Sequence, residues 1–419
     1  MSLACGIDFG TSNSSVALDD GTGARLLPLQ DGATAVPTAL FFSFDDDTTT
    51  FGREAMQRYL MREPGRLLRA IKTLLGTALY EEMTQVRSRR YAFSEILTAF
   101  LAFLRQSTAS GGEAASRVVL GRPAFFVDNN PEADRTAQSQ LEAAARAAGF
   151  RDIAFQFEPI AAALHYEAGV ATEELALVAD IGGGTSDFSL VRVGPELRRK
   201  ADRRGDILGW NGVRVGGTDF DRNLSLATLM PFLGKGSALT SKGLETPSWW
   251  YADLATWHRI NVLYEGKVIT GMRGVLRESA APERIERLIR VVEDRKGHAL
   301  LARIEEAKIA LSGAEATRVE LSDVTQGLAL DVEREQLETA IADGLGRIEG
   351  RVRALLADAG VAGGAVSTVF LTGGSSGMPA VREAILRPLP AAHVIAGDAF
   401  GSVAIGLAID AARRFGPAS

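Results

Sequence analysis

The chain has 419 residues, which is long enough for two or more domains with substantial hydrophobic cores. Its 46 Lys and Arg against 52 Asp and Glu give a formal net charge of −6, so neither nucleic acid nor an acidic membrane surface is expected as a partner. The single cysteine, Cys5, excludes an internal disulfide, and the four histidines show no metal-ligand spacing. With no apolar run long enough for a membrane span and no leader at its start, we expect a cytoplasmic protein.

The first half of the chain alternates between strand and helix patterns. Strands are predicted at 3–9, 14–18, 25–29, 39–44, 117–121 and 153–157. Helical periodicity covers 53–79, 94–107 and 131–149, and Pro159 can open a further helix. Gly149 is a natural C-cap for the helix before it.

The second half repeats this plan. Strands are predicted at 177–193 (a hairpin), 318–321, 328–332 and 368–372, and helices at 300–312, 333–360 and 378–386. Because a strand, glycines and a helix come near the end of each half, we infer an internal duplication. The interval 230–299 has no clear period before Glu283. Its tryptophans, Trp249, Trp250 and Trp257, are expected in the core of an insertion, with a partner-binding face as the alternative.

The phrase LVADIGGGTSDFSL at 177–190 is the most informative part of the chain. An apolar run ends in Asp180, three glycines follow, and Thr185 and Asp187 precede a second β-favouring run, which predicts a hairpin. Glycines let backbone N–H groups approach a phosphate, and a carboxylate at each end of the turn can hold a hydrated magnesium ion. A similar phrase, CGIDFGTSNSSVAL, contains Asp8 before its glycine. Two such phrases indicate two related lobes that face one nucleotide.

Five phrases, taken in order, resemble the actin-like ATPase superfamily, and more specifically the nucleotide-binding domain of the DnaK-type 70-kDa heat-shock chaperones. They are GIDFGTSNS (6–14), FEPIAAALHY (157–166), VADIGGGTSDFSLV (178–191), LTGGSSGMP (371–379) and GSVAIGLAI (401–409). The resemblance covers nearly the whole chain, and within the family the chain is similar to the short, divergent YegD-like members. It implies an α/β fold of two ribonuclease H-like lobes around a central cleft that holds ATP or ADP with Mg²⁺.

The resemblance also implies a domain order. Lobe I would cover 1–170, lobe II would cover 171–395 with a Trp-containing insertion at about 230–299, and a C-terminal helix at 396–419 would return to lobe I. No peptide-binding domain is expected. We therefore expect that a folded partner or co-chaperone bound to lobe II responds when the nucleotide closes the lobes.

The resemblance also implies which residues of this chain form the site, because each family motif can be matched to it position by position. The catalytic residues implied are Lys72 (in IKTLLG), Glu158, Asp180 and Thr185. The residues implied to hold hydrated magnesium are Asp8, Asp180 and Asp187. Those implied to contact the nucleotide are Gly10, Thr11, Ser12, Asn13, Gly182, Gly183, Gly184, Thr185, Gly216, Gly217, Glu305, Lys308, Ser312, Gly373, Gly374 and Ser375.

Elementary chemistry agrees with these roles. Phosphoryl transfer to water needs charge neutralisation and an oriented nucleophile, which Lys72 and a carboxylate can supply. Asp180 or Glu158 could accept the proton or only orient water. Glu305, Lys308 and Ser312 lie three and four apart, so one helix face would present all three. The alternatives are a solvated helix lysine at Lys72 and an ordinary ion pair between Glu305 and Lys308, and Asp219 and Asp221 are expected to be structural.

Two positions depart from the family. The family sandwiches adenine between two arginines, and here those positions are Ile309 and Gly377. Loss of both cations predicts weak nucleotide binding or relaxed base selectivity.

The function that follows is slow, magnesium-dependent ATP hydrolysis by a heat-shock-chaperone-like protein. Two alternatives stay open: a small-molecule kinase of the same superfamily, and a non-catalytic nucleotide-sensing scaffold.

Overall fold

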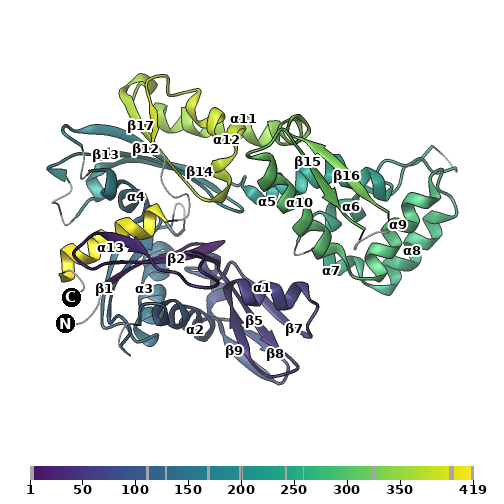
Figure 1. Cartoon of the computed structure of the whole chain (residues 1–419), viewed down its shortest axis with the longest axis horizontal. Coiled ribbons are helices and arrows are strands. Elements are labelled where there is room, and N and C mark those ends of the chain that lie inside the picture. The colour runs from purple at the N-terminus through teal and green to yellow at the C-terminus, as the bar shows by residue number, and fades with distance from the viewer. Residues whose placement is uncertain are drawn as a thin grey trace. The chain divides into compact units, whose positions relative to one another are not determined.

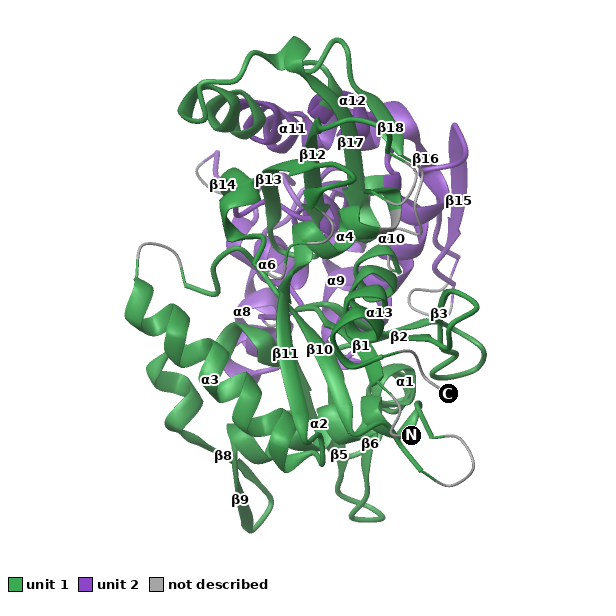
Figure 2. Ribbon diagram, turned by 90° about the vertical axis from the view of Figure 1, so that its left-hand side faces the viewer, with its two compact units in different colours: residues 1–212, 351–376, 386–419 green, residues 213–350, 377–385 purple. Residues whose placement is uncertain are grey.

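The computed structural model describes residues 4–109, 113–127, 130–167, 170–197, 200, 202–240, 243–257, 259–322, 327–395 and 401–416. The chain divides into two compact units, coloured separately in Figure 2. Unit 1 is formed by 1–212, 351–376 and 386–419, and unit 2 by 213–350 and 377–385. None of the helices in the described part of the chain combines the length and the apolar character needed to cross a bilayer.

Unit 1 contains a six-stranded sheet near the N-terminus (Figure 1). Its strands are β1 (Ala4–Phe9), β2 (Asn13–Asp19), β3 (Ala24–Leu26), β4 (Ala35–Pro37), β10 (Arg117–Arg122) and β11 (Asp152–Phe157). The order is β11-β10-β1-β2-β3, with β4 paired to β2. β1 forms an antiparallel hairpin with β2 and a parallel pair with β10, and β10 is parallel to β11.

A second sheet in unit 1 repeats this arrangement. Its strands are β12 (Glu174–Ile181), β13 (Ser186–Val193), β14 (Ile207–Val213), β17 (Val366–Thr372) and β18 (His393–Ile395), in the order β14-β13-β12-β17-β18. β12 and β13 form the antiparallel hairpin, and β12, β17 and β18 are parallel neighbours. The inferred duplication is therefore visible in the pairing of both sheets.

Two helices connect the layers of unit 1. α4 (Glu158–Glu167) packs on β10 and β11 of the first sheet and on β12 and β17 of the second, and α13 (Ser402–Phe415) packs on α4, β1 and β2. A Cβ at Gly406 of α13 would lie 1.8 Å from the carbonyl oxygen of Ala161 in α4, so only glycine permits this crossing. α2 (Phe93–Gln106) packs against α3 (Pro131–Ala147). Phe100 of α2 contacts Phe9 of β1 in the core.

A small antiparallel sheet completes the first part of unit 1. It consists of β5 (Ala39–Ser43), β6 (Thr49–Phe51) and β7 (Gly65–Arg69), with α1 (Gly52–Leu60) packed on it, and the hairpin β8 (Met83–Val86) and β9 (Arg89–Ala92) follows. The continuous helix predicted over 53–79 is wrong beyond Leu60. Arg62 has a left-handed φ of 62° and Pro64 follows, after which the chain turns back and pairs β7 with β5.

Unit 2 is mainly helical. Its elements are α5 (Gly217–Leu224), α6 (Ser248–Leu254), α7 (Ile260–Leu263), α8 (Gly266–Leu276), α9 (Pro282–Glu293), α10 (Gly297–Leu311) and the hairpin β15 (Ala316–Glu320) with β16 (Ala329–Glu333). α11 (Arg334–Asp358) begins in unit 2 and ends in unit 1, and α12 (Pro379–Leu386) lies almost wholly in unit 2.

The interval 230–299 is thus a series of short helices. The expectation that its tryptophans form a core is confirmed for Trp250, which is buried, and wrong for Trp249, whose exposed fraction is 44%. Trp257 is half-buried and packs edge-on against His298 at a ring distance of 4.8 Å.

Candidate functional site

Asp8 and Asp180 occupy equivalent places in the two sheets. Asp8 lies near the end of β1 and Asp180 near the end of β12, each one residue before the last of its strand and just before a glycine turn. Asp180 pairs in register with Asp187 across the second hairpin, as Asp8 pairs with Ser15 across the first. The internal repeat therefore places one carboxylate at the mouth of each glycine turn.

Lys72 and Glu158 form an ion pair beside these carboxylates. Lys72 lies on a short 3-10 helix (Ile71–Leu74), and Glu158 is the first residue of α4. The Lys72 Nζ is 2.8 Å from Glu158 Oε1, and their side chains are only 11% and 16% exposed. The alternative of a solvated lysine is therefore wrong, because Lys72 is mostly buried and paired.

Electrostatic coupling shows that these four charged groups form one cluster. The pKa of Asp8 is raised to about 8, first by burial and then by the negative charge of Glu158, against the opposing effect of Lys72. The pKa of Asp180 is raised to about 7 by burial and by the charges of Asp187 and Glu158. Burial lowers the pKa of Lys72, but Glu158 and Asp8 outweigh it and leave that pKa above its ordinary value. The ammonium group of Lys72 thus pairs with one carboxylate, and the raised pKa values of Asp8 and Asp180 mean that their ionised forms lack enough compensating positive charge.

The second glycine turn is closed by its own hydrogen bonds. The Gly182 N–H donates to the Thr185 carbonyl at 2.9 Å, and the Thr185 hydroxyl donates to Asp187 Oδ2 at 2.9 Å. Gly184 is exposed, and a Cβ there would meet nothing within 4 Å. The bend therefore presents bare backbone, as expected from its glycines.

The phrase LTGGSSGMP (371–379) meets Asp180 at the end of β17. Gly373 has a φ of +79°, and a Cβ there would lie 2.6 Å from Asp180 Oδ1, so glycine is required. The Thr372 side chain hydrogen-bonds to Asp180 and opposes the rise in the pKa of that carboxyl. Gly374 and the buried Ser375 follow in a short 3-10 helix. Sequence reasoning did not single out Thr372, although it directly precedes the glycines of LTGG.

The first glycine turn is held from the side by Thr38. The Thr38 N–H donates to the Ser12 carbonyl and its hydroxyl donates to the Gly10 carbonyl, both at 2.8 Å. Thr11 between them is exposed. Thr38 is a second supporting residue that sequence reasoning missed, because it lies 28 positions from Gly10 and carries no motif of its own.

Unit 2 holds the helix face that was expected to meet the ribose and adenine. On α10, Glu305 is exposed and Ser312 is half-buried, but Lys308 is buried with its Nζ 2.8 Å from Asp221 Oδ1 and 3.3 Å from the Gly217 carbonyl. Lys308 is therefore turned toward α5 and is not presented beside Glu305, so the ordinary Glu305–Lys308 pair does not form. Asp221 is paired with Lys308, and the structural role expected of it stays a prediction.

Asp219 and the two positions that lack the family's arginines also lie in unit 2. The Gly216 N–H donates to Asp219 Oδ2 at 2.9 Å at the start of α5, so Asp219 too is paired within unit 2. Ile309 and Gly377 stand where the family has the two arginines that sandwich adenine. Ile309 is 62% exposed, and Gly377 is exposed with open space around it.

Among the described residues, no three His, Cys, Asp or Glu side chains converge closely enough to ligate a metal ion directly. The raised pKa values of Asp8 and Asp180 still fit a divalent cation, because its positive charge would stabilise their ionised forms. Mg²⁺ commonly keeps several of its waters and contacts only one or two carboxylates, so the cluster suits a hydrated ion.

Two repeated sheets with hairpin glycine turns, acidic residues at both turns and a paired lysine define an ATPase domain of the actin-like class. A model of the family described as Hsp70 protein matches residues 4–232 and 284–416, which make up most of the chain. The chain belongs to the Hsp70 family, and it is accordingly a nucleotide-binding protein for ATP or ADP. The match leaves out 233–283, which lies within the interval expected to hold an insertion.

Proposed function

We propose that this protein is a weak, magnesium-dependent ATPase whose lobes close under the control of the bound nucleotide, and that it is a short, divergent YegD-like member of its family. The observation that supports hydrolysis is the cluster in which Asp8, Asp180 and Glu158 surround Lys72. A purely structural ion pair would not need two further carboxylates whose pKa values are raised by their neighbours.

Asp8 and Asp180 would hold hydrated Mg²⁺, with Asp187 beside them. When bound, the ion would neutralise negative charge on the phosphates. Lys72 would place fixed positive charge at the terminal phosphate, and its pairing with Glu158 keeps the ammonium in one position. The carboxylates would orient the attacking water by accepting its hydrogen bonds, and the exposed N–H groups of the second glycine turn would face the phosphates.

The absence of arginine at Ile309 and Gly377 supports weak binding of the base. An exposed aliphatic side chain and a glycine give none of the cation–π attraction that two arginines would give. We propose that affinity for the nucleotide comes mainly from its phosphates and metal, so ATP and GTP would bind with similar strength.

The test is phosphate release from ATP with no added acceptor, together with calorimetric titration of ATP, ADP and GTP with and without Mg²⁺. Hydrolysis that needs only water and Mg²⁺ supports the proposal, and Asp180→Ala should reduce it by orders of magnitude while the protein stays folded. Phosphate transfer that depends strictly on a small hydroxyl compound would identify a kinase. Nucleotide binding with no turnover would identify a sensing scaffold.

We further propose that a folded protein or co-chaperone in the cytoplasm binds unit 2, and that its binding depends on which nucleotide is bound. Among the described residues of unit 2, four large apolar side chains are exposed in or next to the stretch that the family match leaves out: Phe232, Leu244, Trp249 and Val262. Nucleotide-dependent capture of a partner by the wild type and not by Trp249→Ser is the result that would support this surface. Equal capture by both proteins would exclude it.

A further inference from the structure

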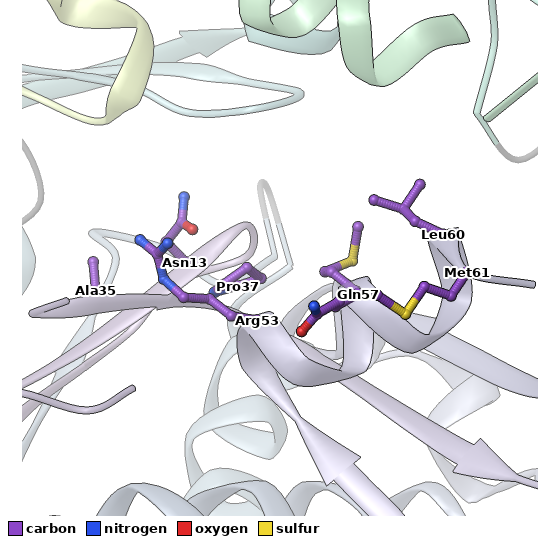
Figure 3. A pocket seen from close by; sticks show the side chains of 8 residues that line it. Asn13, Ala35, Pro37, Arg53, Gln57, Leu60 and Met61 are labelled. Carbon is purple, nitrogen blue, oxygen red and sulfur yellow. The ribbon is translucent and has the colours of Figure 1, made fainter. Parts of the chain in front are cut away.

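A groove of about 530 Å³ runs along α1 in unit 1, and apart from Asn13 none of its lining residues takes part in the chemistry proposed above. It is lined by the first residue of β2, by two residues of β4 and by one side of α1 and its C-cap. The residues are Asn13, Ala35, Pro37, Arg53, Met56, Gln57, Leu60 and Met61 (Figure 3). Its volume falls within the range typical of small-molecule sites, roughly 300–1,000 Å³.

One end of the groove is polar and carries an available positive charge. The side chains of Asn13 and Arg53 lie together at this end (Figure 3). Arg53 is exposed, its backbone N–H donates to Gln30 Oε1 at 2.8 Å, and its guanidinium has no hydrogen bond or ion pair with any residue that the structure describes. A guanidinium offers several donors in one plane, which suits a carboxylate or a phosphate.

The other end of the groove is apolar. Leu60 and Met61 lie there, and Met61 is 71% exposed, which is unusual for a large apolar side chain beside a groove. Met56 also lines the groove. Methionine side chains are flexible and polarisable, so they adapt to apolar ligands of different shape. The nine residues from Arg53 to Met61 span about 12 Å of helix, which sets the length of the groove.

We propose that this groove binds a small anionic amphiphile, with its carboxylate or phosphate at Arg53 and Asn13 and its apolar body over Met56, Leu60 and Met61. A chain of about eight carbons matches the length between the two ends. Neither a fully polar metabolite nor a neutral hydrocarbon would use both ends.

The floor of the groove is continuous with the first glycine turn. Asn13 is both a lining residue and part of the phrase GIDFGTSNS, and it pairs in register with Pro37 of β4. Thr38, the next residue, donates hydrogen bonds to the carbonyls of Gly10 and Ser12. A ligand seated on Pro37 therefore rests on the strand that holds the turn, so its binding is coupled to nucleotide affinity. This second part rests on the proposed nucleotide site.

The probe is octanoate, titrated calorimetrically into the full chain, with hexyl phosphate as a second anionic head and octanamide as the neutral analogue. Arg53→Gln should weaken octanoate binding at least fivefold, and Met61→Ser should weaken octanoate more than acetate. Arg135→Gln is the matched control, because Arg135 is an exposed helical arginine on α3 that does not line the groove. ADP affinity is measured with and without saturating octanoate.

Saturable binding of octanoate and hexyl phosphate that is lost in Arg53→Gln and kept in Arg135→Gln supports the site. Equal binding by both variants, or octanamide binding as tightly as octanoate, overturns it. An ADP affinity that octanoate changes less than twofold overturns the coupling alone. If ADP itself does not bind, the nucleotide proposal fails while the octanoate titrations still decide the groove.

Discussion

The ammonium group of Lys72 lies 2.8 Å from Oε1 of Glu158, across 86 positions of sequence. This contact joins a short 3-10 helix to the N-terminus of α4, the helix that packs on both sheets of unit 1. Because Glu158 also interacts with Asp8 and Asp180, a change at Lys72 alters the charge balance of the whole cluster. The pair is thus a part of the proposed catalytic machinery that can be tested one residue at a time.

Lys72→Ala is expected to reduce ATP turnover at least a hundredfold, because it removes the cation that the described residues place beside Glu158, Asp8 and Asp180. Lys72→Arg keeps the charge and should retain more activity than the alanine variant. Turnover is measured by phosphate release, and folding by far-UV circular dichroism. Wild-type turnover in a folded Lys72→Ala protein would show that Lys72 only balances charge in the core.

Placing arginines at Ile309 and Gly377 together should tighten ATP binding about tenfold, since each cation over the base contributes roughly 0.5–1 kcal/mol. Both positions are exposed, and Gly377 has open space around it, so neither arginine should disturb packing. Titration with inorganic triphosphate is the control, and its affinity should change less than that of ATP. An equal gain for both ligands would mean that the arginines act on the phosphates through charge alone.

The glycine phrases and the longer helices could be predicted from the sequence because local physics decides them. The hairpins that carry Asp8 and Asp180 follow from apolar runs interrupted by glycine, and α3 and α11 follow from long periodic segments. The nucleotide-binding class follows from the order of these phrases, which the family match confirms.

Features decided by distant partners could not be predicted in this way. The segment of β7 reads as a helix until its pairing with β5 is known, and the burial of Lys308 depends on Asp221, which lies 87 positions earlier in the numbering and on another helix. The helices within 230–299 are short, so each offers too few turns for a clear period.

Gly406→Ala should destabilise unit 1 by about 3 kcal/mol or more, because the added Cβ would overlap the backbone of Ala161 and force α13 away from α4. The matched control is Gly346→Ala, an exposed glycine within α11 whose Cβ would meet nothing. That control should be neutral or stabilising by roughly 0.5–1 kcal/mol. Urea unfolding followed by circular dichroism gives both values. If Gly406→Ala unfolds at the wild-type midpoint, the close crossing of the two helices is incorrect.

The unfolding free energy should fall with decreasing pH through the protonation of His298. Burial lowers the pKa of His298 in the folded protein below its ordinary value of 6.5, although the hydrogen bond to the Trp257 carbonyl at 3.0 Å opposes this shift. The unfolded chain therefore binds the proton more readily than the folded one, so stability is fully present above pH 6.5 and is lost as the pH falls through the folded-state pKa.

Urea unfolding at pH 7.5 and at pH 5, monitored by tryptophan fluorescence, compares the wild type with His298→Gln. The variant lacks the titrating group and should lose less stability than the wild type over this range, while His393→Gln, at an exposed histidine, controls for the change in histidine number. Parallel losses in the wild type and His298→Gln would show that this histidine carries no part of the pH dependence.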